Sequence, residues 1–229
     1  MTTKKTALVV FDMAGTTVYD NGNVGAAFQA AFKAHGLEIP QNKIKLVMGY
    51  RKSDAIRMLL SENGKVNGSI DEKIRTIHET FEESMVQFYE SDDTLHSMPD
   101  AEETFEFLNG REVKVALNTG FTRRITNVIT QRLGWNNHPF IDCIITSDEV
   151  PEGRPHPFMI YSIMKQVGVE DPSNVVKVGD TEVDILEGRN ASCGLVIGVT
   201  TGAYTKEALQ QYSPDHILDS LATLRNLLF

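Results

Sequence analysis

The fold is decided by one stretch near the N-terminus, which runs Ala7-Leu8-Val9-Val10-Phe11-Asp12-Met13-Ala14-Gly15-Thr16-Thr17. Its first five residues form an apolar run, the pattern of a strand that is buried on both faces of a parallel sheet. An acid, a glycine and two threonines follow. Because open parallel sheets bind ligands beyond the carboxyl ends of their strands, we expect Asp12 at the mouth of a site. The alternative is an aspartate that merely opens a turn.

The length and net charge of the chain limit the classes of protein to which it can belong. The 229 residues suffice for one large domain or for a core with a smaller insert. The net charge of −9 argues against nucleic-acid binding and for a small-molecule ligand held at a local positive site, with a metal ion as one part of it. No apolar run approaches the roughly 18 residues of a membrane span, and we expect a cytoplasmic enzyme without membrane contact or signal peptide. Cys143 and Cys193, in apolar surroundings, are predicted to be reduced.

The segment from residue 20 to residue 95 predicts an all-α cap. Its apolar residues recur at helical spacing, and we find no convincing strand between about residues 20 and 93. The expected helices span residues 23–35, 41–47, 52–62 and 70–91. Gly36 is expected to cap the end of the first of them. The apolar faces of the first cap helices can pair two chains, so a homodimer through the cap is one expectation.

From residue 100 onward, strands alternate with helices. The expected helices span 100–109, 122–134, 157–167 and 182–191, and the expected strands span 113–117, 141–146, 174–179, 195–199 and 216–218. This alternation is typical of βαβ units and of a doubly wound α/β fold with a parallel sheet. We therefore predict a core of residues 1–19 and 96–229, interrupted by a cap of residues 20–95, with the chain crossing near 18–22 and 92–98.

Two segments of the predicted core have residues that can bind a phosphate-like anion. The strand at 113–117 is followed by Asn118-Thr119-Gly120, where a hydroxyl and backbone N–H groups at a helix start can hold the anion. An ordinary turn capped by Thr122 is the alternative. The second segment is Gly153-Arg154-Pro155-His156-Pro157, in which Arg154 can reach a phosphoryl oxygen or can be a surface residue of a proline-rich loop. His156 receives no role.

The strand at 174–179 ends in Gly179-Asp180-Thr181-Glu182-Val183-Asp184. Asp180 and Asp184 are one helical turn apart, so both can face the same point. Carboxylates that converge repel one another unless a cation lies between them, and oxygen ligands favour Mg²⁺. The alternative is that these acids only cap the helix dipole.

The cap carries the string Met48-Gly49-Tyr50-Arg51-Lys52-Ser53-Asp54. Lys52 stands at a predicted helix start beside Arg51. The helix dipole and the neighbouring guanidinium would both lower its pKa and leave some neutral amine, as an imine-forming lysine requires. A solvated surface lysine is the alternative.

The core strings resemble the motifs of the haloacid dehalogenase superfamily, in which an aspartate nucleophile and Mg²⁺ act on phosphoryl groups. That resemblance covers nearly the whole chain and implies a Rossmann-like core with an inserted cap. It also implies these roles: Asp12 as nucleophile; Thr119, Gly120 and Arg154 on the phosphoryl oxygens; Asp12, the Ala14 carbonyl and Asp180 as Mg²⁺ ligands; and Asp184 behind them, orienting water.

Position 14 departs from the superfamily pattern, which has a second aspartate there. The version with Ala14, and the cap string, resemble the phosphonatase branch, the family of phosphonoacetaldehyde hydrolases. Its lysine forms a Schiff base with the substrate aldehyde, which implies that role for Lys52, with Met48 and Gly49 beside the substrate. The chain also departs from the branch itself: Ala55 stands where that family has a proton-transferring histidine, and Phe121 replaces a tyrosine.

The loss of the acid at position 14 and the presence of Lys52 fit one chemical argument. An ester's leaving oxygen needs a proton from the second aspartate, which Ala14 cannot supply. A carbon–phosphorus bond next to an iminium needs none, because its electrons leave as an enamine. We therefore expect a hydrolase of phosphonoacetaldehyde or a related 2-oxoalkylphosphonate. The alternatives are a phosphatase for small monoesters, resembling phosphoglycolate phosphatase, in which Lys52 binds an anion, and a catalytically silent binding protein that has lost the acid at position 14.

Overall fold

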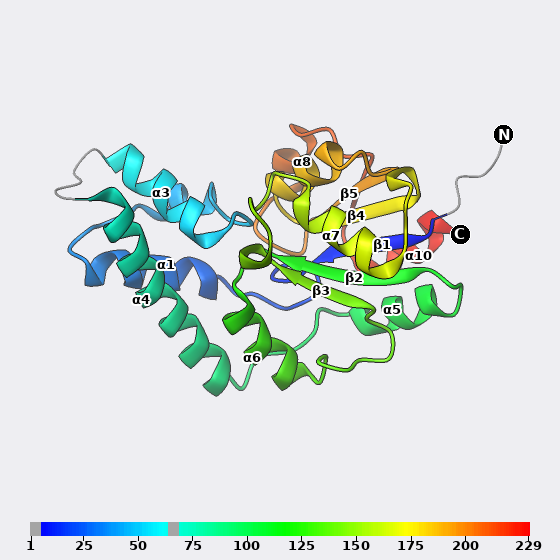
Figure 1. Ribbon diagram of the computed structural model, residues 1–229, viewed down its shortest axis with the longest axis horizontal. Helices are drawn as coiled ribbons and strands as arrows, with labels where there is room; N and C mark the ends of the chain where they lie inside the picture. The colour runs from blue at the N-terminus through cyan, green and yellow to red at the C-terminus, as the bar shows by residue number, and fades with distance from the viewer. Residues whose placement is uncertain (1–5, 64–68) are drawn as a thin grey trace.

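The computed structural model describes residues 6–63 and 69–229. Six strands form one parallel sheet in the order β3-β2-β1-β4-β5-β6. They span Leu8–Asp12 (β1), Lys114–Thr119 (β2), Cys143–Thr146 (β3), Val175–Gly179 (β4), Leu195–Val199 (β5) and His216–Leu218 (β6). Strand β1 lies between β2 and β4, and all five of its residues are buried, as its unbroken apolar run predicts (Figure 1).

Helices cover both faces of the sheet, as the doubly wound prediction requires. The core helices are α5 (Ala101–Asn109), α6 (Arg123–Leu133), α7 (Phe158–Val167), α8 (Glu182–Asn190), α9 (Lys206–Gln210) and α10 (Leu224–Leu228). Side chains of β1 alternate between the faces: Val9 and Phe11 pack with the apolar residues of α5, α6 and α10, whereas Leu8 and Val10 pack with those of α7 and α8. Short 3₁₀ turns at Ser147–Glu149, Pro172–Asn174 and Leu221–Thr223 complete the core.

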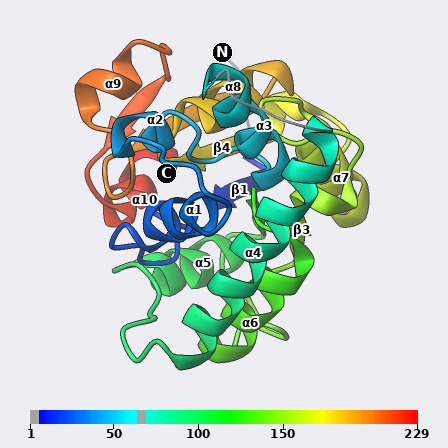
Figure 2. The same ribbon diagram turned by 90° about the vertical axis from the view of Figure 1, so that its left-hand side faces the viewer.

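Four helices form the cap at one end of the molecule, away from α10 (Figure 1). They are α1 (Asn23–Ala34), α2 (Gln41–Lys45), α3 (Lys52–Asn63) and α4 (Ile70–Ser91). Figure 2 looks onto this end, with α1 to α4 in front of the sheet. The apolar faces of these helices meet inside the cap, where the rings of Phe28 and Phe81 lie 4.5 Å apart.

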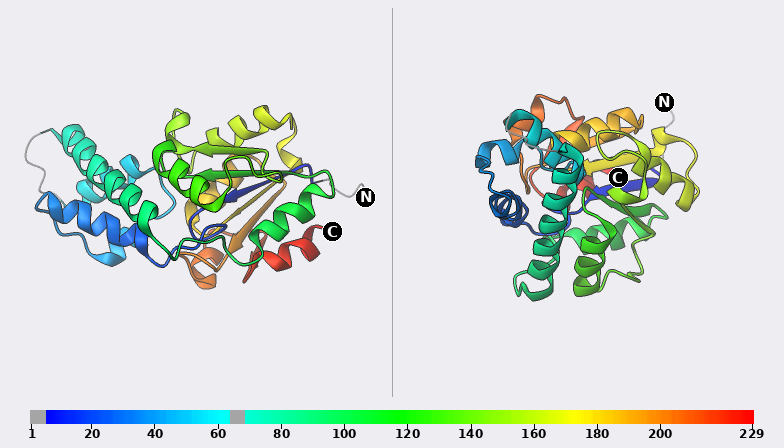
Figure 3. Two further views of the ribbon diagram at one scale, coloured as in Figure 1. Left: turned by 90° about the horizontal axis from the view of Figure 1, so that it is seen from below. Right: turned by 60° about the vertical axis from the view of Figure 1, so that its left-hand side comes forward.

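The two connections between cap and core run side by side. Val18 pairs with Ser97 in an antiparallel bridge, and the backbone N–H of Met98 donates to the carbonyl of Thr17 at 2.8 Å. The crossings near 18–22 and 92–98 thus lie next to each other in space. Helix α4 also packs on α6, and the two helices lie side by side in the right view of Figure 3. The exact boundaries of cap and core stay a prediction.

The predicted elements are all present, and their ends differ from the prediction by two residues at most. Helix α1 ends at Ala34, and Gly36 takes the left-handed conformation just beyond it, as expected. Cys143 and Cys193 are buried free thiols, also as expected. No described helix is long and apolar enough to cross a membrane. Leu46 and Met58 are exposed apolar residues of the cap, and pairing of two chains through this region stays a prediction.

Candidate active site

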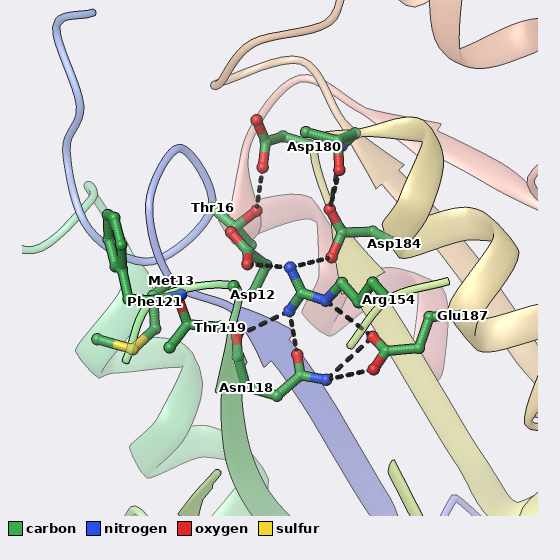
Figure 4. A network of polar contacts seen from close by, with 12 residues as sticks. Asp12, Met13, Thr16, Asn118, Thr119, Phe121, Arg154, Asp180, Asp184 and Glu187 are labelled. Carbon is green, nitrogen blue, oxygen red and sulfur yellow. Dashed lines mark hydrogen bonds and ion pairs between the residues drawn. The ribbon is translucent and has the colours of Figure 1, made fainter. Parts of the chain in front are cut away.

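The ends of three neighbouring strands place the polar residues of the site. Asp12 is the last residue of β1 and is level with Asn118 on β2. Asp180 follows directly after β4, on the other side of β1. Because the strands are parallel, their carboxyl ends lie at one edge of the sheet, and the side chains converge there (Figure 4).

Three buried carboxylates meet at this edge. Oxygens of Asp12, Asp180 and Asp184 all lie within 4.8 Å of one another. Burial, together with the charges of Asp12 and Asp184, raises the pKa of Asp180 well above its usual range. Burial and the charge of Asp184 raise the pKa of Asp12 against the opposing effect of Arg154. A divalent cation between Asp12 and Asp180 would remove this repulsion and keep both acids ionised.

Asp184 caps a helix and also belongs to the cluster of buried acids, so capping does not exclude the predicted metal site. One oxygen accepts hydrogen bonds from the Thr181 backbone N–H at 3.2 Å and from the Thr181 hydroxyl, a capping box at the start of α8. Its other oxygen lies 3.1 Å from Arg154 and 3.0 Å from Lys177. These two cations outweigh burial and lower the pKa of Asp184. Asp184 therefore stays charged behind the open acids, as a residue that orients other groups must.

Arg154 is a buried residue of this network, which excludes the surface alternative. Its guanidinium donates to Asp12 at 2.6 Å, to Glu187 at 3.0 Å and to the backbone carbonyl of Asn118 at 2.8 Å. Only 1% of its surface is exposed. Burial alone would lower the pKa of Arg154, but the surrounding carboxylates raise it, so the guanidinium remains charged. Arg154 therefore holds one oxygen of Asp12, and its predicted contact with a phosphoryl oxygen stays a prediction.

Sequence reasoning missed two buried charged residues of this network, the cation Lys177 and the acid Glu187. Lys177 lies in the middle of β4 and donates to Asn118 at 2.7 Å. Glu187 on α8 accepts from Asn118 at 2.9 Å and lies 3.2 Å from Lys177. Both are fully buried. The one available signal was a charged residue inside an otherwise apolar strand, Val175-Val176-Lys177-Val178.

The charges of the core half of the site support a divalent cation. Four buried carboxylates face two buried cations, namely Asp12, Asp180, Asp184 and Glu187 against Arg154 and Lys177. With all six ionised, two negative charges remain. A Mg²⁺ ion bound by Asp12, Asp180 and the Ala14 carbonyl would balance them, and all three of these residues line the open side of the site.

Cap and core together enclose a cavity of about 230 Å³ in front of these acids. The predicted residues that line it are Asp12, Ala14, Met48, Gly49, Lys52, Thr119, Gly120 and Asp180. Arg154 and Asp184 lie behind its wall. The cap adds residues that sequence reasoning did not assign, which are Asp20, Gly22, Val24, Gly25, Gln41, Ile44 and Lys45.

Lys52 reaches this cavity from the start of α3 and is only 4% exposed. Its amine donates to the Tyr50 carbonyl at 3.2 Å and lies 5.0 Å from the centre of the Phe121 ring. Burial lowers the pKa of Lys52 to about 8, with Asp12 raising it and Arg154 lowering it. The expected direction of the shift is thus present, but its main cause is burial. Arg51 points elsewhere and donates to the carbonyls of Ser147, Pro151 and Val150.

Close backbone contacts hold the lysine segment against the core. A side chain on Gly120 would meet the carbonyl oxygens of Tyr50 at 2.4 Å and Gly49 at 2.7 Å. A side chain on Gly49, which has a φ of 83°, would meet the Thr181 hydroxyl. Tyr50 also donates to Glu182 at 3.0 Å. The backbone on both sides of Lys52 is therefore anchored, which fixes where the amine enters the cavity.

Residues 6–192 match the family of haloacid dehalogenase-like hydrolases. The chain belongs to this family. Across 97% of the chain it is 29% identical to a phosphonoacetaldehyde hydrolase of Bacillus cereus, of which 88% is covered. Among solved structures it is similar to a phosphonoacetaldehyde hydrolase-like protein of Oleispira antarctica, with a TM-score of 0.85, 21% identity, and coverage of 99% of this chain and 92% of that one.

A structure from Lactobacillus delbrueckii subsp. bulgaricus, assigned to the phosphoglycolate phosphatases, shares the fold with a TM-score of 0.79, 21% identity, and coverage of 98% of this chain and 99% of that one. These likenesses to solved structures show the fold. This chain has a buried cluster of three aspartates and has no acid at position 14.

Proposed function

We propose that this hydrolase cleaves the carbon–phosphorus bond of phosphonoacetaldehyde or a related 2-oxoalkylphosphonate with the help of Mg²⁺. The observation that carries the proposal is that a buried amine of the cap, Lys52, lines the same cavity as a buried acid of the core, Asp12. The near full-length similarity to the phosphonoacetaldehyde hydrolase of Bacillus cereus supports it.

The absence of an acid at position 14 favours this bond over an ester bond. Loss of an ester's alkoxide needs a proton, and general acid catalysis of such a step is worth about 10²–10⁴-fold. Ala14 has no proton to give. If Lys52 forms an iminium with the carbonyl, the electrons of the carbon–phosphorus bond flow into the C=N bond, and the carbon leaves as an enamine without needing a proton at once.

Lys52 prepares the carbon side of the reaction. With a pKa of about 8, roughly one amine in ten is neutral at pH 7, compared with fewer than one in a thousand for an ordinary lysine. The neutral amine attacks the carbonyl carbon, and water leaves as the iminium forms. Phe28 and Phe121 lie beside the amine and keep bulk water away from the imine.

Asp12 acts on the phosphorus side. Its carboxylate attacks phosphorus as the carbon–phosphorus bond breaks, which gives an aspartyl-phosphate that water then hydrolyses. Arg154 holds one Asp12 oxygen at 2.6 Å and so directs the other toward the cavity. Thr119 and Gly120 would hold the phosphoryl oxygens, and Asp184 would orient the water. Mg²⁺ bound by Asp12, the Ala14 carbonyl and Asp180 would supply positive charge against the phosphoryl oxygens.

The test is phosphate release from phosphonoacetaldehyde measured beside a panel of small phosphate monoesters. We expect turnover of the phosphonate, and its loss in Lys52→Ala. Lys45→Ala is the matched control, because Lys45 also lines the cavity but is exposed and belongs to the same cap. Turnover of the phosphonate that survives in Lys52→Ala would contradict the proposal.

A phosphatase for small monoesters, of the phosphoglycolate phosphatase kind, is the second candidate. It would use the same Asp12, Thr119 and metal site, with Lys52 binding an anionic group. The fold that the chain shares with the protein from Lactobacillus delbrueckii is the observation that favours this second candidate. Mg²⁺-dependent turnover of a monoester that exceeds turnover of the phosphonate would select it.

A further inference from the structure

One carboxylate of the cavity has no part in the reaction described so far. Asp20 lies where the chain enters the cap, just before α1. It lines the same cavity as Lys52, and one of its oxygens accepts from the backbone N–H of Asn23 at 2.9 Å and of Val24 at 3.5 Å. These bonds fix the carboxylate at the start of the helix while it stays half-buried at the cavity wall.

Formation of an imine needs a group that moves protons. The lysine ammonium must lose a proton before its nitrogen can attack, and the hydroxyl of the addition product must gain one before it can leave. Of the described carboxylates that line the cavity, Asp12 and Asp180 serve the phosphoryl group and the metal ion. Ala55 and Phe121 cannot carry a proton. Asp20 is the acid that remains on the cap side.

The charges around Asp20 suit this task. Burial raises the pKa of Asp20, while its backbone hydrogen bonds and Lys52 lower it. Burial lowers the pKa of Lys52, and Asp20 is among the acids that raise it. The Tyr89 hydroxyl finds no hydrogen-bond partner among the described residues, and burial together with the charges of Asp20, Asp92 and Asp12 raises its pKa. The affinities of Asp20 and Lys52 for a proton are thus closer to each other than those of the free side chains.

We propose that Asp20 is the acid–base group that transfers protons during imine formation at Lys52. This proposal rests on the proposed function. The Asp20 carboxylate takes a proton from the Lys52 ammonium, directly or through one water in the cavity. The freed nitrogen pair forms the C–N bond as the C=O pair moves onto oxygen, and Asp20 returns the proton to that oxygen.

The same carboxylate then completes the dehydration. It removes one of the two protons that remain on nitrogen and delivers it to the hydroxyl, so that the C–O bond breaks and water leaves. The nitrogen pair forms the C=N bond of the iminium. Two protons have moved from nitrogen to oxygen, and Asp20 ends in the ionisation state in which it began.

The test compares Asp20→Asn with the wild-type chain in borohydride trapping with phosphonoacetaldehyde. Asparagine keeps an oxygen for the N–H groups of Asn23 and Val24, so we expect an unchanged melting temperature. The rate at which the reduced adduct forms at Lys52 should fall about 100-fold, in the range of general acid–base catalysis. Added formate should restore part of that rate in Asp20→Gly, where a small acid can enter the vacated space.

The outcomes separate this proposal from the proposed function. A wild-type adduct with an equal trapping rate in Asp20→Asn would overturn the role of Asp20 and leave the proposed function intact. A normal trapping rate with slower phosphate release would show that Asp20 binds substrate, and it would also overturn the role. No adduct in the wild-type chain would overturn both proposals.

Discussion

Arg154 donates to Asp12 at 2.6 Å from a position behind the wall of the cavity, with both side chains almost fully buried. The guanidinium also binds Glu187 and the Asn118 carbonyl. One cation therefore connects Asp12 of β1 with Asn118 of β2 and with Glu187 of α8. The position of the Asp12 carboxylate, our proposed nucleophile, depends on all three of these elements.

Removal of this cation should affect both stability and turnover. Arg154→Ala leaves the buried Asp12 carboxylate without its cation, and it leaves Lys177 as the remaining cation beside Asp184 and Glu187. Loss of one partner of a buried ion pair costs about 3–5 kcal/mol in the free energy of unfolding. Urea unfolding measures the loss. Arg75→Ala is the control, because the Arg75–Glu79 pair is exposed and its loss should cost less than about 1 kcal/mol. An equal loss in the two variants would contradict the buried network described here.

Binding of Mg²⁺ should stabilise the chain through Asp180. The wild-type melting temperature should rise with Mg²⁺ and fall back with a chelator, because the ion removes the repulsion between Asp12 and Asp180. Asp180→Asn should abolish this rise and should itself stabilise the metal-free chain, since it removes one of the repelling charges. Asp71→Asn, an exposed cap variant, should keep the wild-type response. A response to Mg²⁺ that persists in Asp180→Asn would place the ion elsewhere.

The buried amine should reduce stability in a manner that depends on pH. The pKa of Lys52 is about 8 in the folded chain against an ordinary value of 10.5, so the unfolded chain binds more protons between these values. The penalty is therefore complete below about pH 8, shrinks as the pH rises, and is absent above 10.5. Lys52→Met should raise the free energy of unfolding by roughly 1–3 kcal/mol at neutral pH, and by little above 10.5.

The control for this prediction is Lys45→Met, since Lys45 is exposed at the same cavity. Its effect on the free energy of unfolding should be small at every pH. A Lys52→Met variant that is less stable than the wild-type chain at neutral pH would show that the amine is well solvated, against the buried position described here.

The contact between the cap and the core should be sensitive to a single methyl group. Gly120→Ala places a carbon 2.4 Å from the Tyr50 carbonyl, so the cap segment must move away. Turnover at low substrate concentration should fall about tenfold or more, because a shift of about 1 Å in a reacting group has effects of that size. Gly110→Ala is the control, since its nearest neighbour would lie at 3.5 Å. A fully active Gly120→Ala variant would contradict a fixed lysine segment.

Much of the fold could be predicted because strong local patterns coincide with it. The apolar run before Asp12 predicted a strand buried on both faces, and the alternation after residue 100 predicted a parallel sheet. Asp12 and Asp180 could be predicted because each lies at the carboxyl end of a strand, and Asp184 because it lies one helical turn after Asp180. The order of strands away from β1 could not, since spacing along the chain does not fix which neighbours pair.

Other features depended on contacts between distant segments. The network of Asn118, Lys177 and Glu187 joins three elements, and no short string contains it. The pKa of Lys52 was predicted in direction from its helix position and from Arg51. In the structure burial is the main cause, which sequence spacing cannot measure. The cavity residue Asp20 was missed because it precedes a helix, where an acid is common for reasons of capping alone.

The central claim is that the amine of Lys52 forms a covalent bond to the carbonyl carbon of the substrate, while the carboxylate of Asp12 attacks its phosphorus. Its most direct test is mass spectrometry of the chain after incubation with phosphonoacetaldehyde and borohydride. The account predicts a reduced adduct on the peptide that contains Lys52, none on the peptide that contains Lys45, and none at all in Lys52→Ala. An active enzyme that releases phosphate from phosphonoacetaldehyde yet shows no adduct at Lys52 would contradict it.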